Sequence, residues 1–357
     1  MMSESITEQQ KLIDFVVNEG NGVKGLSQTN LKSIPEKFIH PPEERLDQTL
    51  VTAEKSIPTI DVSKWDDPQV ADSICKAAAQ WGFFQIINHG IPIEVLENVK
   101  KAAHDFFELP VEERRKYLKE NSPSPSVELM TSHNPLVAKV LEWKDFLIHI
   151  CDGQEIEDSK FWPPVSRDQV LEYMKWAKPL IRRILNVLLK GLNTKEIDET
   201  NEYILMGKLF VDLIYYPICP NPGLAVGAGR HADISLITVL LQDDTGGLYV
   251  REPEGNGWIH VTPVKEALVI NIGDVLQIMS NDKYKSIEHR VNVNGNNNRV
   301  SVPIFVDPIP NAVIGPVPEV LEAGVKPIYK QVVYEDYFNH FFSKGHDGKK
   351  AIEYAKI

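Results

Sequence analysis

Three residues of the chain have the types and spacing that could bind a metal ion. His231 and Asp233 are separated by one residue, and His289 follows much later. On a β-strand, side chains at positions i and i+2 project to the same face, so His231 and Asp233 could bind one metal ion together. A ligand from another strand, His289, would complete one face of the ion and leave the opposite positions open. Two imidazoles and one carboxylate in this arrangement predict an iron(II) site that reacts with O2.

A second pair of polar residues follows the last of these three. Arg299 and Ser301 are also separated by one residue, within the apolar segment RVSVPIF. A guanidinium and a hydroxyl that point together into a core need an anionic partner, because an unpaired buried charge is costly. Arginine binds a carboxylate through two parallel hydrogen bonds, so the distal C5 carboxylate of 2-oxoglutarate is the natural occupant.

Each pair also has a simpler interpretation. His231 and Asp233 alone fit a solvated, hydrogen-bonded pair, and Arg299 alone fits an internal salt bridge. The two pairs together favour a metal ion with a bound oxoacid.

The elements that must position these residues change in character near residue 203. Beyond it, short β-type runs alternate with Gly, Asn and Pro. Many short strands at this spacing predict a sandwich or barrel, here a jelly roll whose mouth can hold a ligand. The expected strands are 209–215, 235–241, 246–251, 267–272, 275–279, 284–293 and 300–306.

The first half of the chain is predicted to be mainly helical. Helical spacing is found at 67–80, 95–106 and 168–191, and Pro179 is expected to kink the last of these helices. Strands are expected in IPTIDV, WGFFQIINHG and FLIHI, and 118–136 is expected to be a loop. Residues 335–357 return to a helical pattern.

These patterns together predict an α+β protein. Its core is a double-stranded β-helix (jelly roll) with a mainly helical N-terminal region and a C-terminal helix. We expect a polar, irregular arm at 1–56, a helical region at 57–202, a catalytic jelly roll at 203–310 and a C-terminal helical segment at 311–357.

Composition and charge narrow the possible partners. The 357-residue chain has 38 basic and 50 acidic residues, a formal charge of −12, which argues against nucleic acid or an anionic membrane. It contains no long apolar run and no basic, apolar secretory signal at its start. Its three cysteines form no CxxC motif, so neither a disulfide framework nor a structural zinc site is expected. A cytoplasmic monomer that acts on a small-molecule substrate is the resulting expectation.

The HxD pair, the distant histidine and the Arg-x-Ser pair resemble the plant 2-oxoglutarate/Fe(II) dioxygenase superfamily. Further segments resemble this family in the same order: WGFFQIINHG, YYPICPNP (215–222), GRHADISLITVLLQDDTGGLYV (229–250) and NIGDVLQIMSNDKYKSIEHRV (271–291). The resemblance implies that His231, Asp233 and His289 hold Fe(II). It also implies an enzyme that uses 2-oxoglutarate and O2, supported by ascorbate, and that releases succinate and CO2 as it hydroxylates its substrate.

The same resemblance assigns the co-substrate site. Tyr216, Arg299 and Ser301 would bind the C5 carboxylate of 2-oxoglutarate. Ile214 departs from the family pattern, in which an Asn-Tyr-Tyr-Pro run places an asparagine at this position. We expect this change to weaken or reshape the binding of the oxoacid.

Within the superfamily, the strongest resemblance is to the feruloyl-CoA and p-coumaroyl-CoA ortho-hydroxylases of coumarin biosynthesis. It runs nearly end to end and includes the segments 19–46, LEWKDFL (141–147) and HDGKKAIEYAKI (346–357). It implies hydroxylation of a cinnamoyl ring beside its side chain, after which the product closes to scopoletin or umbelliferone. SVELMTSHNPL (126–136) and FLIHICDG (146–153) depart from that group, and both are expected near the substrate.

Other functions remain open at this point. Related enzymes hydroxylate free coumarins such as scopoletin, and a non-catalytic binder of an oxoacid would share the fold. A cupin-like isomerase with another metal would not need the Arg299 and Ser301 pair. We expect 120–136 and the C-terminal helix to form a substrate lid, and His149 could face the substrate from its strand.

Overall fold

Strands from both halves of the chain form one large, curved sheet. The computed structural model describes residues 2–132, 135–136, 138–153, 155–344 and 348–357. The eight strands of this sheet follow the order β1-β2-β10-β7-β12-β5-β4-β3. All neighbours are antiparallel except β1 and β2. Their bounds are β1 (Thr59–Asp61), β2 (Phe83–Ile87), β3 (Val127–Thr131), β4 (Asp145–Cys151), β5 (Lys208–Tyr216), β7 (Ile237–Gln242), β10 (Leu268–Ile272) and β12 (Arg299–Asp307).

A smaller sheet completes the jelly roll. Its four strands have the order β6-β11-β8-β9. Inward side chains of both sheets line one common cavity, as expected for a double-sheet barrel with alternating inward and outward residues. The bounds are β6 (Ala228–His231), β8 (Leu248–Arg251), β9 (Trp258–His260) and β11 (His289–Val291).

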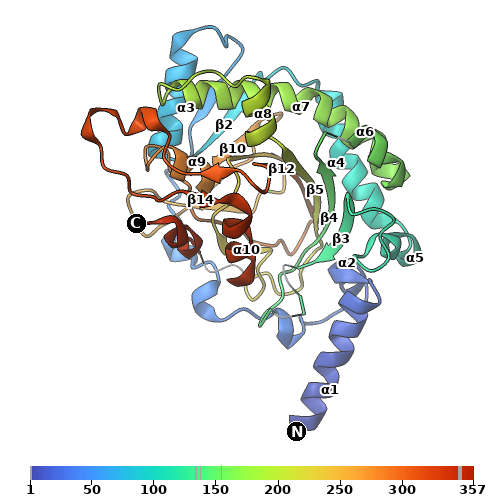
Figure 1. Cartoon of the computed structure of the whole chain (residues 1–357). Helices are drawn as coiled ribbons and strands as arrows, with labels where there is room; N and C mark the ends of the chain where they lie inside the picture. Colours follow the sequence, from blue (N-terminus) through green and yellow to red (C-terminus); the bar gives the residue numbers. More distant parts are fainter. Residues whose placement is uncertain (1, 133–134, 137, 154, 345–347) are drawn as a thin grey trace.

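Three long helices cover the outer face of the large sheet (Figure 1). Helix α3 (Pro68–Gln80) contacts β2, α4 (Ile93–Glu108) contacts β5 and β12, and α7 (Pro164–Lys190) packs on both helices. Helix α7 runs through Pro179 and buries one apolar face along its length. The shorter helices of this half are α5 (Val111–Arg114), α6 (Glu155–Asp158) and α8 (Glu199–Leu205). Within the described residues, no helix is long and apolar enough to cross a membrane.

The N-terminal residues are more regular than the sequence predicts. Helix α1 (Met2–Ile13) is followed by a π-helical turn and by α2 (Gly22–Ser27), and α1 projects from the body in Figure 1. The amides of Val23 and Lys24, at the start of α2, donate to the two carboxylate oxygens of Asp145 at 2.9 and 2.7 Å. This contact attaches the arm to the first residue of β4.

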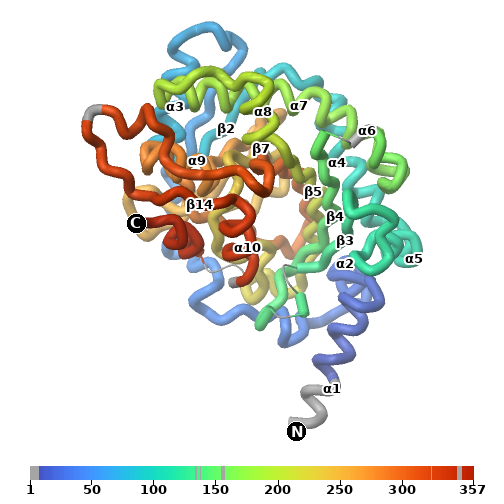
Figure 2. Tube along the Cα trace, in the orientation of Figure 1, coloured from blue at the N-terminus to red at the C-terminus, as the bar shows by residue number. Residues whose placement is uncertain are grey.

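The C-terminal helix lies across one end of the barrel, as Figures 1 and 2 show. Helix α10 (Tyr334–Lys344) follows a two-stranded ribbon of β13 (Val313–Ile314) and β14 (Val332–Val333). A 3-10 helix, Lys350–Ala355, takes the place of the second half of the predicted C-terminal helix. The tail also meets the small sheet, because the amide of Gly348 donates to the carbonyl of Arg230 at 3.0 Å.

Two of the predicted elements are wrong. Residues 275–279 form a helix, α9 (Asp274–Met279), because a short, wholly buried apolar run has the same pattern in a strand and in a core helix. Its start needs Gly273, since a Cβ there would collide with the carbonyl oxygen of Ser235. The expected loop at 118–136 contains β3, whose alternating burial pairs it with β4. Positions 133 and 134 of that loop lie outside the described residues.

Candidate active site

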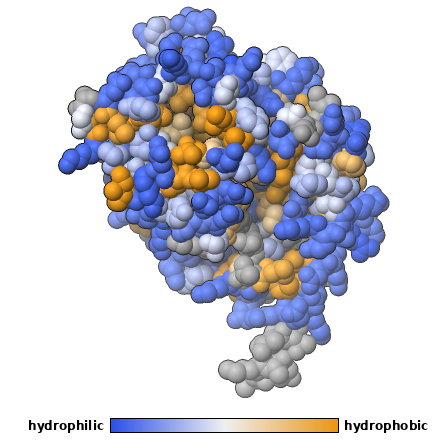
Figure 3. All heavy atoms as spheres, viewed as in Figure 1, coloured by the Kyte–Doolittle hydropathy of each residue, from blue (hydrophilic) through white to orange (hydrophobic). Residues whose placement is uncertain are grey.

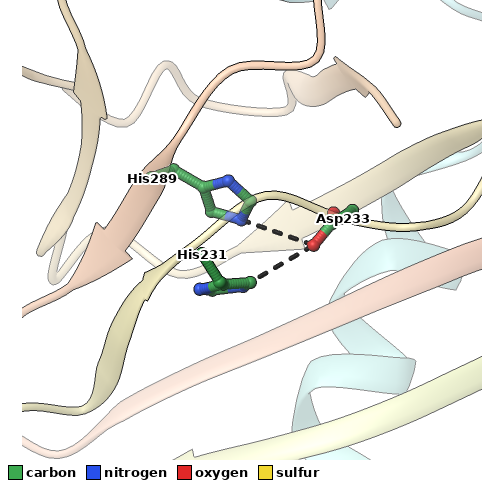
Figure 4. A group of neighbouring side chains, drawn as sticks. All are labelled: His231, Asp233 and His289. Carbon is green, nitrogen blue, oxygen red and sulfur yellow. Dashed lines mark ion pairs between the residues drawn. The ribbon is translucent and has the colours of Figure 1, made fainter. Parts of the chain in front are cut away.

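The structure brings His231, Asp233 and His289 together at the edge of the small sheet (Figure 4). Strand β6 ends with His231, and β11 begins with His289, which is its direct cross-strand partner. The Nε2 atom of each histidine lies 3.6 Å from Asp233 Oδ1. Asp233 itself lies just beyond the end of β6, so the expectation of one strand for both ligands is wrong. Within the described part of the chain, this is the one cluster of three such side chains with metal-ligand spacing.

Backbone carbonyls set the orientation of both imidazoles. His231 Nδ1 donates to the carbonyl of Gly229 at 2.7 Å, and His289 Nδ1 donates to the carbonyl of Ile287 at 3.2 Å. Because Nδ1 carries the proton in each case, Nε2 presents its lone pair to the common centre.

Two further side chains hold the carboxylate of Asp233. Its Oδ2 atom accepts hydrogen bonds from Thr238 Oγ1 at 2.5 Å and from Asn271 Nδ2 at 2.8 Å. Oδ1 therefore remains for the shared centre between the imidazoles. Three converging donor atoms of this chemistry fit a divalent iron ion with open positions on its far side. Neither Thr238 nor Asn271 was found from the sequence, because no spacing rule links them to Asp233.

Tyr216, Arg299 and Ser301 meet on the wall of the large sheet. Arg299 is the cross-strand partner of Tyr216 in β5 and lies with its guanidinium 4.9 Å from the centre of that ring. It donates to Ser301 Oγ and to Gln242 Oε1, both at 3.2 Å. Arg299 is 2% exposed, so its charge is almost completely withdrawn from water.

The donors around Arg299 are incompletely satisfied. Arg299 Nε and Gln242 Nε2 are buried and have no hydrogen-bond acceptor among the described residues. No carboxylate in the described part of the chain forms an ion pair with Arg299 in the structure, so the internal salt bridge considered above is not found. A buried cation with free donors fits a carboxylate ligand, as an oxoacid supplies.

The metal-ligand cluster and the cluster around Arg299 both line one cavity of about 370 Å³. This volume is in the range of small-molecule sites. Apolar side chains surround a hollow on the face shown in Figure 3, and α10 lines the cavity with Phe338, Phe341 and Phe342. The other phenylalanines that line it are Phe83, Phe146, Phe210 and Phe305.

Three charged side chains of the cavity were missed in the sequence. Lys144 lies just before β4, Asp212 lies on β5 and Asp307 ends β12, and all three line the cavity. Burial alone would lower the pKa of Lys144, but Glu142, Tyr216 and Asp212 together raise it, and Lys144 Nζ lies 3.0 Å from Glu142. Burial raises the pKa of Asp212 to about 7, although Lys144 opposes the shift. The alternation of β5 could have placed Asp212 on the face of Tyr216, had the direction of that face been known.

His149 does not face the substrate side. It is fully buried on the face of β4 opposite to Phe146 and Ile148, which line the cavity. Its Nε2 atom lies 3.0 Å from Ser166 Oγ, and burial lowers its pKa to about 3. It is therefore a neutral core histidine.

Comparison with known proteins agrees with this site. The family described as the 2OG-Fe(II) oxygenase superfamily matches residues 208–308, and the N-terminal region described as non-haem dioxygenase in morphine synthesis matches 57–165. The chain belongs to the 2OG-Fe(II) oxygenase superfamily, and Fe(II) and 2-oxoglutarate are its cofactor and co-substrate.

Within that family, the chain is closely related to plant ortho-hydroxylases. It is 54% identical to the feruloyl CoA ortho-hydroxylase 1 of Arabidopsis thaliana, over 100% of this chain and 99% of the relative. It is 53% identical to a bi-functional coumaroyl CoA and feruloyl CoA ortho-hydroxylase of Ruta graveolens, over 97% of this chain and 95% of the relative.

Solved structures share the whole architecture. A crystal structure of JOX2 in complex with 2OG, Fe and JA superimposes with a TM-score of 0.82 at 33% identity, over 94% of this chain and 97% of that chain. A rice dioxygenase for auxin oxidation, at 21% identity and a TM-score of 0.73, shares the fold. The predicted jelly roll with helical flanks is thereby confirmed.

Proposed function

We propose that this enzyme hydroxylates the ring of feruloyl-CoA, p-coumaroyl-CoA or both, at the carbon beside the side chain. Relatives with these names share 52–55% of their residues with it over nearly their full length. The observation that carries the proposal is the cavity, in which phenylalanines surround the space beside His231, Asp233 and His289. A planar phenylpropanoid ring suits such walls. The product would close to a coumarin.

We propose the following roles for the polar residues. His231, Asp233 and His289 hold the ion, and Tyr216, Arg299 and Ser301 hold the C5 carboxylate of 2-oxoglutarate. When bound, iron with 2-oxoglutarate and O2 supplies the oxidising power: one oxygen atom enters the ring C–H bond, the other enters succinate, and CO2 leaves. The phenylalanines of α10 exclude water from this space and press the ring against the opposite wall.

Near the expected 2-oxoglutarate site, Ile214 departs from the family pattern, which has an asparagine at this position. It lies opposite Ser301 on β12 and opposite Phe146 on β4, and it lines the cavity. We propose that it replaces a polar contact to the oxoacid with an apolar wall, while the contacts from Arg299 and Tyr216 remain.

We further propose that residues 203–310 form the catalytic unit, because all six of these polar residues lie between Tyr216 and Ser301. Residues 57–202 would support it, 1–56 would form the arm, and 311–357 would close the cavity. We propose a cytoplasmic monomer that binds neither nucleic acid nor membrane. Cys75, Cys151 and Cys219 form no disulfide among the described residues, which supports a reducing compartment.

The test is a turnover assay on a substrate panel. Purified protein is loaded anaerobically with Fe(II) and 2-oxoglutarate, and O2 is then added with feruloyl-CoA, p-coumaroyl-CoA, scopoletin or a free cinnamic acid. Mass spectrometry should find succinate in step with an ortho-hydroxylated acyl-CoA. Hydroxylated scopoletin without acyl-CoA product would move the substrate to free coumarins. His231→Ala should be inactive, and His260→Ala, a histidine outside the cavity, should retain turnover.

A further inference from the structure

Asp212 is a buried carboxyl group without a full set of partners. It is 8% exposed and lines the cavity from β5 of the large sheet. Its Oδ1 atom is completely buried and has no hydrogen-bond partner among the described residues. Buried polar atoms in folded proteins are nearly always paired, so an unpaired one that faces a cavity indicates a missing ligand group.

The neighbours of Asp212 offer little compensation. On its own face of β5 lie Phe210 and Ile214, and its partner on β4 is Ile148. The charged groups that act on it are Lys144, which attracts it, and Asp307, which repels it. The ammonium of Lys144 already lies 3.0 Å from Glu142. Apart from Lys144 and Asp307, these neighbours of Asp212 are apolar, and the buried Oδ1 atom of Asp212 still needs a donor.

The position of Asp212 along β5 places it in the substrate part of the cavity. Tyr216 on β5 is the cross-strand partner of Arg299 on β12, and these two residues carry donors for the oxoacid. Asp212 lies four residues before Tyr216 on the same face, or about 13 Å along the strand. Oxoglutarate held at Arg299 and at the metal would leave this region free for the substrate.

We infer that Asp212 is a specificity-determining residue that accepts a hydrogen bond from a hydroxyl group on the aromatic ring of the substrate. The identity of the ring rests on the proposed function: in feruloyl-CoA and p-coumaroyl-CoA it carries a hydroxyl group para to the side chain. A carboxylate facing phenylalanine walls holds this hydroxyl and rejects a ring that lacks it, because the acceptor would then stay buried and unpaired.

The first test measures binding without turnover. Protein loaded with Fe(II) and 2-oxoglutarate under nitrogen is titrated calorimetrically with p-coumaroyl-CoA and with cinnamoyl-CoA, which lacks the para hydroxyl. The wild-type Kd ratio should favour the hydroxylated ring by at least about tenfold. Asp212→Leu should bring the ratio close to one and leave the affinity for cinnamoyl-CoA unchanged or higher. Asp212→Asn, which keeps a carbonyl acceptor, should retain most of the preference.

Asp307→Asn tests the competing acceptor, because Asp307 lines the same cavity and its Oδ1 atom is also buried without a partner among the described residues. It should leave the ratio as in the wild type. An unchanged ratio in Asp212→Leu, or a ratio lost only in Asp307→Asn, would overturn the assignment. Circular dichroism and thermal melting of each variant separate a local effect from loss of the fold. The assignment would also be overturned if the affinity for a ligand with a 4-aminomethyl ring depended on Asp212 while the affinity for the hydroxylated ring did not, because the site would then bind cations.

The test distinguishes this inference from the proposed function. The same titrations are repeated with p-coumaric and cinnamic acids, and with scopoletin and its methyl ether, while turnover of the acyl-CoA esters is followed separately. If the acyl-CoA esters are hydroxylated but binding shows no preference for the para hydroxyl group, the proposed function is retained and the inference is rejected. If the free acids or coumarins show a preference for the ring hydroxyl group that is lost in Asp212→Leu, but the acyl-CoA esters are not turned over, the proposed function is rejected and the inference is retained.

Discussion

At the scale of single residues, the metal site depends on how Asp233 is held. Thr238 and Asn271 bind the same oxygen of Asp233, so its other oxygen has a fixed direction. Thr238→Val keeps the shape of the side chain and removes one of these bonds. We expect the affinity for Fe(II) to fall by about 10- to 100-fold.

An anaerobic Fe(II) titration measures this loss. Thr245→Val is the control, since the Thr245 hydroxyl donates to the carbonyl of Asn298 away from the metal ligands. Equal affinities in the two variants would mean that Thr238 does not orient the ligand.

Arg299 gives a second prediction at this scale. Arg299→Leu removes the buried cation and leaves Gln242 and Ser301 without their donor. The concentration of 2-oxoglutarate needed for half-maximal succinate formation should rise by about 100-fold, as expected for a charged hydrogen-bonded pair. Arg299→Lys should give a smaller rise, because the charge remains and the planar fork is lost. Fe(II) binding should stay close to that of the wild type, and unchanged oxoglutarate dependence would reject the carboxylate assignment.

Residue spacing predicted part of this site. The pairs at 231/233 and 299/301 could be recognised because each pair is local, and His289 because its residue type completed a known ligand set. Thr238, Gln242 and Asn271 could not be recognised, since only the strand register brings them to Asp233 and Arg299. Asp212 lies in the predicted strand 209–215, but nothing in the sequence indicates that its carboxyl group is buried and faces the cavity.

At the scale of elements, the contact between α9 and α10 supports one side of the cavity. Tyr337 lies on α10 and donates to Asp274 Oδ2 on α9 at 2.7 Å, while Ser286 donates to Oδ1 at 2.6 Å. The neighbouring α10 side chains Phe338 and Phe341 line the cavity. Helix α10 is therefore tied to the core through a buried carboxylate.

Tyr337→Phe should loosen this helix without removing its aromatic packing. The lost hydrogen bond leaves one carboxylate oxygen of Asp274 short of a donor, which should lower the free energy of local opening by about 1 to 2 kcal/mol. Hydrogen exchange of the amides at 334–344 should become roughly 5- to 30-fold faster. Tyr203→Phe, at an exposed tyrosine, should leave these rates unchanged. Protection equal to the wild type would show that packing alone holds α10.

The prediction of elements succeeded where periodicity extended over many residues. Helices α3, α4 and α7 and strands β5, β7 and β12 follow their apolar patterns closely. Strands β6 and β9 are too short to give a pattern, and β6 carries a metal ligand. The N-terminal arm was misjudged because the apolar residues that anchor it, such as Val23 and Phe38, are sparse among polar neighbours.

At the scale of the whole molecule, the buried carboxyl group of Asp212 lowers the free energy of unfolding at neutral pH. The pKa of Asp212 is raised to about 7 in the folded protein, above its value in the unfolded chain. The folded state then binds more protons at this group between about pH 4 and 7, so its contribution to stability falls as the pH rises through that window. The groups that set the shift are Lys144 and Asp307 in addition to burial.

Asp212→Asn should therefore stabilise the protein in a pH-dependent way. Urea unfolding at pH 8 should show a gain of about 1 to 3 kcal/mol, and the gain should be much smaller at pH 4.5, where the wild-type carboxyl is already protonated. Asp105→Asn, at a half-exposed carboxylate of α4 that pairs with Lys101, provides the background comparison. An equal gain at both pH values would mean that charge burial at Asp212 is not its source.

The order of strands in the large sheet also has a consequence for synthesis on the ribosome. Strand β2 is complete at Ile87, but its antiparallel neighbour β10 begins at Leu268. At about 5 to 20 residues per second, the nascent β2 edge waits roughly 10 to 40 s for its partner. During that time an apolar, aromatic strand is open to pairing with other chains. The enzyme's yield in a cell should thus depend on chaperones that bind nascent chains, and its first 200 residues made alone should aggregate.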